Sequence, residues 1–461
     1  MSSLHELSAR AQAALIKSGN LTSIALTEHY LARISRLDGR LGAYVRVTDE
    51  LALRQAAAAD HLIRSQGTDA VGPLHGVPVA IKDNIDVEDV PTGWGIAERT
   101  EGAVGDDHLV GLLRAAHQPI LGKTHLPEFA LSCHAENHIG GDTRNPWSEK
   151  HTPGGSSGGS AAAVSAGLAP LALGTDAGGS VRIPASCCGL VGVRPSNGTV
   201  SGNPGDPAVT GLSVPGVLAR DAGDAAALLA VIAGQAPGDL SAARTWQGQG
   251  GQLRIGLSVR PMVPGLEPAP VCVRAAQDLA SDLARMGHEV VPVELGEDNV
   301  VAQAFRDTWS VVAASYEVDD ESSLGAFTRM MREQGRAVTG VQLHESLALF
   351  RGVALMLEEF VFGGVDFLVT PTLATPPPLR GAFTTSANEE ESFAAMSRFM
   401  PYTPMYNIAG MPAVSVPVSK ADGLPIGAMI GGRHGSEGRL LLEVDRILGD
   451  RGALGLAPGW A

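Results

Sequence analysis

Two glycine-rich segments of the sequence hold serines that could act as nucleophiles. They are GGSSGG over 154–159 and DAGGSVRIP over 176–184. Glycine lets the backbone bend sharply and leaves a neighbouring serine hydroxyl uncovered. The run Ala-Gly-Gly-Ser over 177–180 is also a series of backbone N–H donors with little side-chain bulk, which suits an oxyanion hole. Serine is a weak nucleophile, so either segment would need a neighbouring base.

Lys82 is a candidate for that base, because it directly follows a short apolar stretch in VAIKDN. A lysine in apolar surroundings loses its proton more easily and can then accept one from a hydroxyl. Each feature also has an ordinary explanation, since glycine–serine loops are common linkers and a lysine at a strand end commonly points into water. Taken singly, these residues leave both interpretations open.

The composition is typical of a globular protein and argues against some partners. Of the 461 residues, 44% are hydrophobic and 18% are charged, and the formal net charge is −15. A charge that negative argues against nucleic acid or an anionic membrane as the main partner. We expect no signal peptide and no membrane span. No CxxC pair occurs, so we expect a reducing cytoplasm and no disulfide framework; the cysteines are Cys133, Cys187, Cys188 and Cys272.

Helical and strand patterns alternate along the chain, which predicts an α/β fold. The polar, glycine-rich stretch 235–251 is the best linker candidate, and it is equally compatible with a joint inside one sheet and between two domains. Helices are expected over 2–36, 50–66, 107–117, 158–167, from about Pro184, and over 221–233, 268–287, 298–361 and 436–449. Strands are expected within 72–87 and over 119–124, 170–174, 253–259, 288–295, 365–372, 411–419 and 426–432.

Several long motifs occur in a fixed order: GVPVAIKDNID, GKTHLPEFA, TPGGSSGGSAAAV, LGTDAGGSVRIPASCCGLVGVRPS, NIAGMPAVSVP and DGLPIGAMIGGR. With these motifs the sequence closely resembles the amidase signature family of serine amide hydrolases over nearly its whole length. The resemblance implies one domain over 1–461 with a large twisted mixed β-sheet sandwiched between layers of helices. Residues 20–235 would form the core with the N-terminal helices, and 252–461 the rest of the sheet and the variable helices of the substrate pocket.

The resemblance also implies a Ser–cisSer–Lys triad. Ser180 matches the nucleophile, Lys82 matches the base, and Ser156 matches a bridging serine that follows an unusual cis peptide bond. The residues that match the oxyanion hole by their backbone amides are Ala177, Gly178, Gly179 and Ser180. The residues that match positions supporting the triad are Ser157, Thr175, Asp176 and Arg182.

Two short segments depart from the usual family pattern and predict a specialised substrate pocket. Ser132, Cys133 and His134 stand where the family usually has small residues, and Trp94 stands where it usually has threonine or alanine. Cys133 and His134 could also join His138 in a metal cluster, but no fourth ligand is evident, so we expect no metal.

The implied reaction is double displacement at Ser180, which cleaves the carbon–nitrogen bond of a small-molecule carboxamide or acylamide and releases ammonia or an amine. No metal or organic cofactor is implied. Two alternatives share the triad: the glutaminase subunit of a tRNA-dependent amidotransferase, and an esterase, carbamate or urea hydrolase. The expected partner is a small-molecule amide, with no nucleic acid or membrane partner, and a homodimer is compatible with the resemblance.

Overall fold

The centre of the protein is one mixed sheet of eleven strands. The computed structural model describes residues 3–96, 99–137, 141–201, 210–234, 251–296, 299–386 and 388–460. The strand order is β1-β3-β2-β6-β8-β7-β12-β13-β11-β9-β10. The strands are β1 Tyr44–Val47, β2 Val79–Lys82, β3 Ile120–Thr124, β6 Ala172–Asp176, β7 Val191–Arg194, β8 Val214–Ala219, β9 Arg254–Leu257, β10 Glu289–Pro292, β11 Phe367–Pro371, β12 Ala413–Ala421 and β13 Leu424–Gly432.

Strands from the two halves of the sequence meet inside this sheet. β7 pairs with β12 in antiparallel register, with Val193 opposite Val414. Near the candidate lysine the pairing is parallel, since β2 lies between β3 and β6. The linker candidate 235–251 lies outside the described residues except for its last position. A separate two-stranded ribbon is formed by β4 Glu136–Asn137 and β5 Gly141–Asp142.

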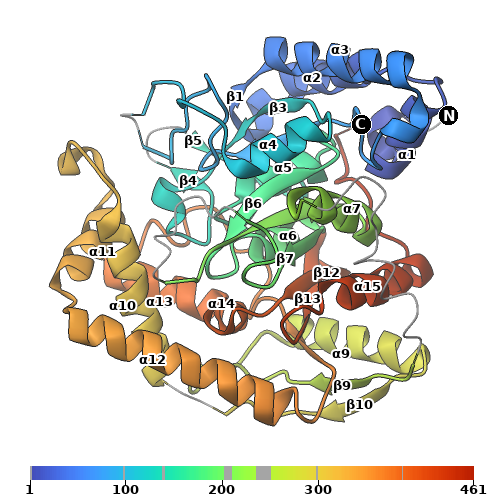
Figure 1. The fold of residues 1–461 in the computed structure, drawn as a ribbon. Coiled ribbons are helices and arrows are strands. Elements are labelled where there is room, and N and C mark those ends of the chain that lie inside the picture. Colours follow the sequence, from blue (N-terminus) through green and yellow to red (C-terminus); the bar gives the residue numbers. More distant parts are fainter. Residues whose placement is uncertain are drawn as a thin grey trace.

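Helices lie around the sheet in several groups (Figure 1). α2 and α3 lie together at the top of the view, whereas α10 to α13 group at the lower left. No helix in the described part of the chain is long and apolar enough to cross a bilayer. The helices are α1 Ala9–Lys17, α2 Ser23–Leu41, α3 Asp49–Gln66, α4 His108–Ala115, α5 Gly158–Ser165, α6 Arg182–Cys188, α7 Ala222–Ile232, α9 Pro270–Arg285, α10 Asn299–Ser315, α11 Ala326–Ala337, α12 Gly340–Met356, α13 Glu389–Phe399, α14 Pro404–Ala409 and α15 Glu437–Arg451.

The α/β prediction is confirmed, but three strands of the main sheet were not expected. β1, β7 and β8 are short or contain glycine and proline, as in VGVR and VPGVLA. Such residues interrupt the alternating pattern from which strands are recognised in a sequence. The burial of all six residues of β8 shows that its place in the sheet is set by tertiary packing.

Glycines on three adjacent strands let the two serine segments approach the sheet closely. Gly174 of β6 lies opposite Gly216 of β8, and Gly192 lies on β7. A Cβ atom added to Gly174 would lie 2.5 Å from the Ser157 Oγ atom. One added to Gly192 would lie 2.4 Å from the Ala185 Cβ atom. The absence of side chains at these positions therefore sets the height of both segments above the sheet.

This close approach predicts that Gly174→Ala lowers the free energy of unfolding by about 1–3 kcal/mol, because the added methyl group overpacks the site. Urea unfolding followed by fluorescence would measure the loss. Gly111→Ala is the matched control, because Gly111 is an exposed residue of α4 with no heavy atom within 4 Å of the added Cβ. The control should be as stable as the parent or slightly more stable. A Gly174→Ala protein as stable as the parent would contradict this packing account.

Candidate active site

Lys82 is the last residue of β2, and its side chain is fully buried. Its Nζ atom lies 2.7 Å from the Oγ atom of Ser156 and 2.8 Å from the Oγ1 atom of Thr175. Asn84 donates from Nδ2 to the same Thr175 oxygen at 3.0 Å. The lysine nitrogen is therefore held among hydroxyl groups, with one of them on a serine that the sequence had singled out.

Burial lowers the pKa of Lys82 to about 7, although the negative charge of Asp176 acts in the opposite direction. Removal from water penalises the charged ammonium more than the neutral amine. A pKa near 7 means that a large share of the lysine is neutral at neutral pH. In that form the nitrogen carries a lone pair and can accept a proton from the Ser156 hydroxyl.

Ser156 and Ser180 line the same small cavity, whose volume is about 20 Å³. The peptide bond between Gly155 and Ser156 is cis, as the resemblance implied. The two segments are joined by a hydrogen bond of 3.0 Å from the Ser157 amide to the Ser180 carbonyl. Ser180 is 9% exposed, so its hydroxyl lies at the edge of the buried region, where a substrate could reach it.

The backbone next to Ser180 offers free amide donors. Among the described residues, the amides of Ala177, Gly178 and Ser180 donate to no protein acceptor. Gly179 departs from the expectation, because its amide donates to the Asp176 Oδ1 atom at 2.8 Å. That bond closes the turn in front of Ser180. Gly179 thus shapes the loop, and the other amides remain available to a substrate oxygen.

A buried ion pair holds this turn from below. Asp176 and Arg182 form an ion pair at 2.8 Å with both side chains fully buried. Burial alone would raise the pKa of Asp176, but Arg182 holds it well below its usual range. The Asp176 carboxylate also accepts from the amides of Gly179 and Val181. A carboxylate that stays charged can therefore fix several backbone donors at once.

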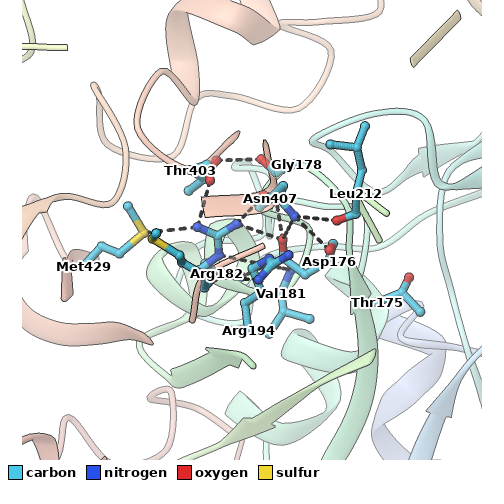
Figure 2. Close-up of polar contacts among 12 residues, drawn as sticks. Thr175, Asp176, Gly178, Val181, Arg182, Arg194, Leu212, Thr403, Asn407 and Met429 are labelled. Carbon is cyan, nitrogen blue, oxygen red and sulfur yellow. Dashed lines mark hydrogen bonds and ion pairs between the residues drawn. The ribbon is translucent and has the colours of Figure 1, made fainter. Parts of the chain in front are cut away.

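Two residues from the second half of the chain complete the network (Figure 2). Thr403 donates from Oγ1 to the Gly178 carbonyl at 2.7 Å. Asn407 of α14 donates from Nδ2 to Asp176 and accepts from Arg182 at 2.6 Å. Fixing the Gly178 carbonyl also fixes the orientation of the peptide that bears the next amide. The loop before Ser180 is therefore held from both halves of the sequence.

The residues expected in the substrate pocket lie in three different places. Trp94 lines the small cavity together with Ser156 and Ser180. Cys133 lines a neighbouring apolar cavity. Ser132 and His134 instead line a separate polar cleft, because successive residues of this segment point to different sides. The role of these residues in a substrate pocket stays a prediction, and the cleft of Ser132 and His134 includes neither Ser156 nor Ser180.

The cluster of Cys133, His134 and His138, at which no metal is expected, lies only partly within the described residues. His138 lies outside them, and burial lowers the pKa of His134 to about 4. In the ranges that the structure describes, no group of three or more histidine, cysteine, aspartate and glutamate side chains comes together.

Sequence reasoning missed several residues of the site. Asn84 lies two positions after Lys82, in the motif VAIKDN, where only the lysine suggested a role. Asn407 lies in the motif NIAGMP, where its amide role gave no separate signal. Thr403 precedes a proline in a stretch without a recognisable motif. Trp309 stands in the expected helical stretch 298–361, where the sequence does not show which aromatics face the site, and it lines the cavity with Ser180.

The fold and this site belong to a known class of hydrolases. The family model described as Amidase matches residues 25–441. AmiB2 of Mycobacterium tuberculosis, whose name gives amidase as a provisional activity, is 38% identical over 454 residues, which cover 95% of each chain. The 6-aminohexanoate-cyclic-dimer hydrolase of Paenarthrobacter ureafaciens is 33% identical over 472 residues, covering 95% of this chain and 93% of the relative.

Solved structures agree with these relatives. The structure of 6-aminohexanoate cyclic dimer hydrolase matches with a TM-score of 0.88 and 30% identity, covering 100% of this chain and 98% of the other. The native peptide amidase from Stenotrophomonas maltophilia matches with a TM-score of 0.81 and 29% identity, covering 99% of each. The chain belongs to the amidase signature family. It is an amidase, a hydrolase acting on carbon–nitrogen bonds, and nothing in these similarities favours an amidotransferase subunit or an esterase.

The Thr403 contact predicts that Thr403→Val lowers kcat, because the loop that bears the Ala177, Gly178 and Ser180 amides loses one of the hydrogen bonds that hold it in place. A hydrogen bond is worth about 0.5–1.5 kcal/mol, which corresponds to roughly a two- to ten-fold loss in rate. We expect KM to change little, since Thr403 is fully buried and lines none of the three cavities described above. Steady-state kinetics on any amide that the enzyme hydrolyses would measure both constants.

Thr403→Ser is the matched control, because it keeps the hydroxyl and should retain most of the activity. If Thr403→Val keeps the parental kcat, or if Thr403→Ser loses as much as the valine variant, the hydroxyl does not position the loop.

Proposed function

We propose that Ser180 is the nucleophile, Ser156 the proton relay and Lys82 the base of this amidase. The observation that carries the proposal is the buried contact of 2.7 Å between the Lys82 nitrogen and the Ser156 hydroxyl, beside a cavity that Ser180 also lines. Thr175 and Asn84 orient the lysine through its second hydroxyl contact. The substrate is a small-molecule amide.

In the first half of the reaction, the Ser180 oxygen attacks the amide carbonyl carbon. Its proton passes to the Ser156 oxygen as the Ser156 proton passes to the neutral Lys82 nitrogen. The carbonyl oxygen becomes negative and is held by the amides of Ala177 and Gly178, with the Ser180 amide beside them. When the intermediate collapses, the proton returns through Ser156 to the leaving nitrogen, and the carbon–nitrogen bond breaks.

The second half of the reaction repeats these steps with water in place of Ser180. Water attacks the ester carbon of the acyl-enzyme and gives its proton through Ser156 to Lys82. The bond from that carbon to the Ser180 oxygen then breaks, and the relay returns the proton to Ser180. One amide and one water thus become one acid and one amine or ammonia, and the enzyme is restored.

The Lys82 assignment predicts a rate that depends on pH in one direction. Because burial lowers the pKa of Lys82 to about 7, the neutral base is lost as the pH falls below that value. We expect kcat/KM to be level at higher pH and to fall about ten-fold per pH unit on the acid side. Lys82→Ala should lower kcat/KM by on the order of a thousand-fold.

Lys150→Ala is the matched control, because Lys150 is an exposed lysine that lines none of the cavities described above. The Lys150→Ala variant should keep the parental rate and pH profile. The Ser180→Ala variant should show the background rate of hydrolysis that does not depend on Ser180. A rate that stays level down to about pH 5, with chemistry rate-limiting, would exclude a lysine base of this kind.

We further infer a cytoplasmic location. All four cysteines are free and buried in the structure, which fits a reducing compartment. The acidic net charge of −15 supports a small-molecule substrate and argues against a polyanionic one.

A further inference from the structure

An apolar cavity of about 140 Å³ lies beside the loop that precedes Ser180. Its walls come from α10, α12, α13 and α14, together with loops near Leu131 and Met262. Among the described residues, Ser397 alone brings a hydroxyl to the lining, and that hydroxyl donates to the Phe393 carbonyl at 2.9 Å. The cavity therefore offers little to a polar group and much to an apolar one.

The cavity adjoins the reaction site, and side chains of α10 lie between the two. Trp309 lines both this cavity and the small cavity that holds Ser156 and Ser180. Its indole donates to the Leu131 carbonyl at 3.1 Å, which fixes the ring. Phe305 stacks on Trp309 with ring centroids 6.0 Å apart.

The inner end of the cavity reaches the backbone that would hold the substrate oxygen. A Cβ atom added to Gly178 would lie 3.1 Å from Phe305 Cζ and 3.7 Å from Met400 Cε. Both side chains line the cavity. Ala177 packs in the same hydrophobic cluster as Phe305. Phe305 and Met400 therefore form the wall between the loop and the cavity, so an acyl group would enter the cavity past Phe305.

The direction of the relay decides which group that is. The leaving nitrogen receives its proton from Ser156, and Ser156 and Asn84 line the small cavity but not the apolar one. The amine therefore departs on the side of the small cavity. The acyl group extends the other way, past Ala177 and Gly178.

We propose that this cavity is the acyl subsite and that the preferred substrates are amides of carboxylic acids with an apolar group about the size of benzene, aryl or alkyl. The size follows from the volume, since a closed apolar cavity of about 150 Å³ accommodates benzene. Four methionines, at positions 262, 396, 400 and 405, line it and allow some variation in shape. The assignment rests on the proposed roles of Ser180 and Ser156.

The test compares two substrate series. The acyl series consists of acetamide, butanamide, hexanamide and benzamide, and the ammonia that they release is measured. Because ammonia is the leaving group throughout, no apolar leaving group competes for the cavity. We expect kcat/KM to rise about four-fold per added methylene, because each buried methylene is worth about 0.8 kcal/mol. In the amine series, acetamides carrying N-methyl to N-hexyl groups should show a much weaker dependence on chain length.

Val353→Phe tests the position of the subsite. Val353 is a buried residue of α12 that lines the cavity, and a phenyl ring at this position would fill the cavity. We expect hexanamide hydrolysis to fall at least ten-fold while acetamide hydrolysis persists, which also shows that the variant folds. Val341→Phe is the matched control, because Val341 lies on the same helix and is 67% exposed. It should leave both rates unchanged.

The outcomes separate the two proposals. The proposed catalytic roles would be overturned if the Ser180→Ala variant still hydrolysed the amides, or if the parent protein hydrolysed none of them. Two results would overturn the acyl subsite alone, provided that hydrolysis depends on Ser180. In the first, kcat/KM rises with the length of the amine and not of the acyl group. In the second, kcat/KM rises with acyl length but Val353→Phe does not reduce that rise.

Discussion

The proposed chemistry of this enzyme depends on keeping one lysine, Lys82, out of water without giving it a carboxylate partner. A second buried lysine on the next strand shows the contrast. Lys123 of β3 lies 3.1 Å from the Asp83 carboxylate, so its positive charge is balanced. Among the described residues, the Lys82 nitrogen instead contacts neutral groups of Ser156 and Thr175. Two lysines on neighbouring strands thus have different surroundings, and those of Lys82 suit its proposed role in proton transfer.

The second requirement is a rigid loop in front of Ser180, the proposed nucleophile. The Asp176–Arg182 pair would be costly to bury if its remaining hydrogen-bonding capacity were unused. Here backbone amides satisfy Asp176, and Asn407 and the Thr403 carbonyl satisfy Arg182. The loop before Ser180 therefore depends on residues more than 200 positions later in the chain. The continuity of the sheet through β7 and β12 brings these parts together.

Much of this site could be predicted because its chemistry is concentrated in short segments. Lys82, Ser156 and Ser180 each stand in a motif whose residue types suggest a role. Thr403 and Asn407 could not be found this way, because their roles follow from tertiary contacts and not from local pattern. The same holds for β7 and β8, where glycine is required by close packing and hides the strand pattern. The division of 132–134 between two cavities also depends on side-chain direction, which spacing alone does not give.

The most direct test of the account is to find the acyl group on the enzyme during turnover. The enzyme would be mixed with a substrate amide, quenched in acid within the first turnovers, digested and examined by fragmentation mass spectrometry. Cleavage after Lys150 and Arg182 places Ser156 and Ser180 in one peptide, so fragmentation has to assign the modified residue. The account predicts an added acyl mass on Ser180 that disappears as the substrate is exhausted. An acyl group on Ser156, or turnover in which no acylated peptide forms even when deacylation is slow, would contradict it.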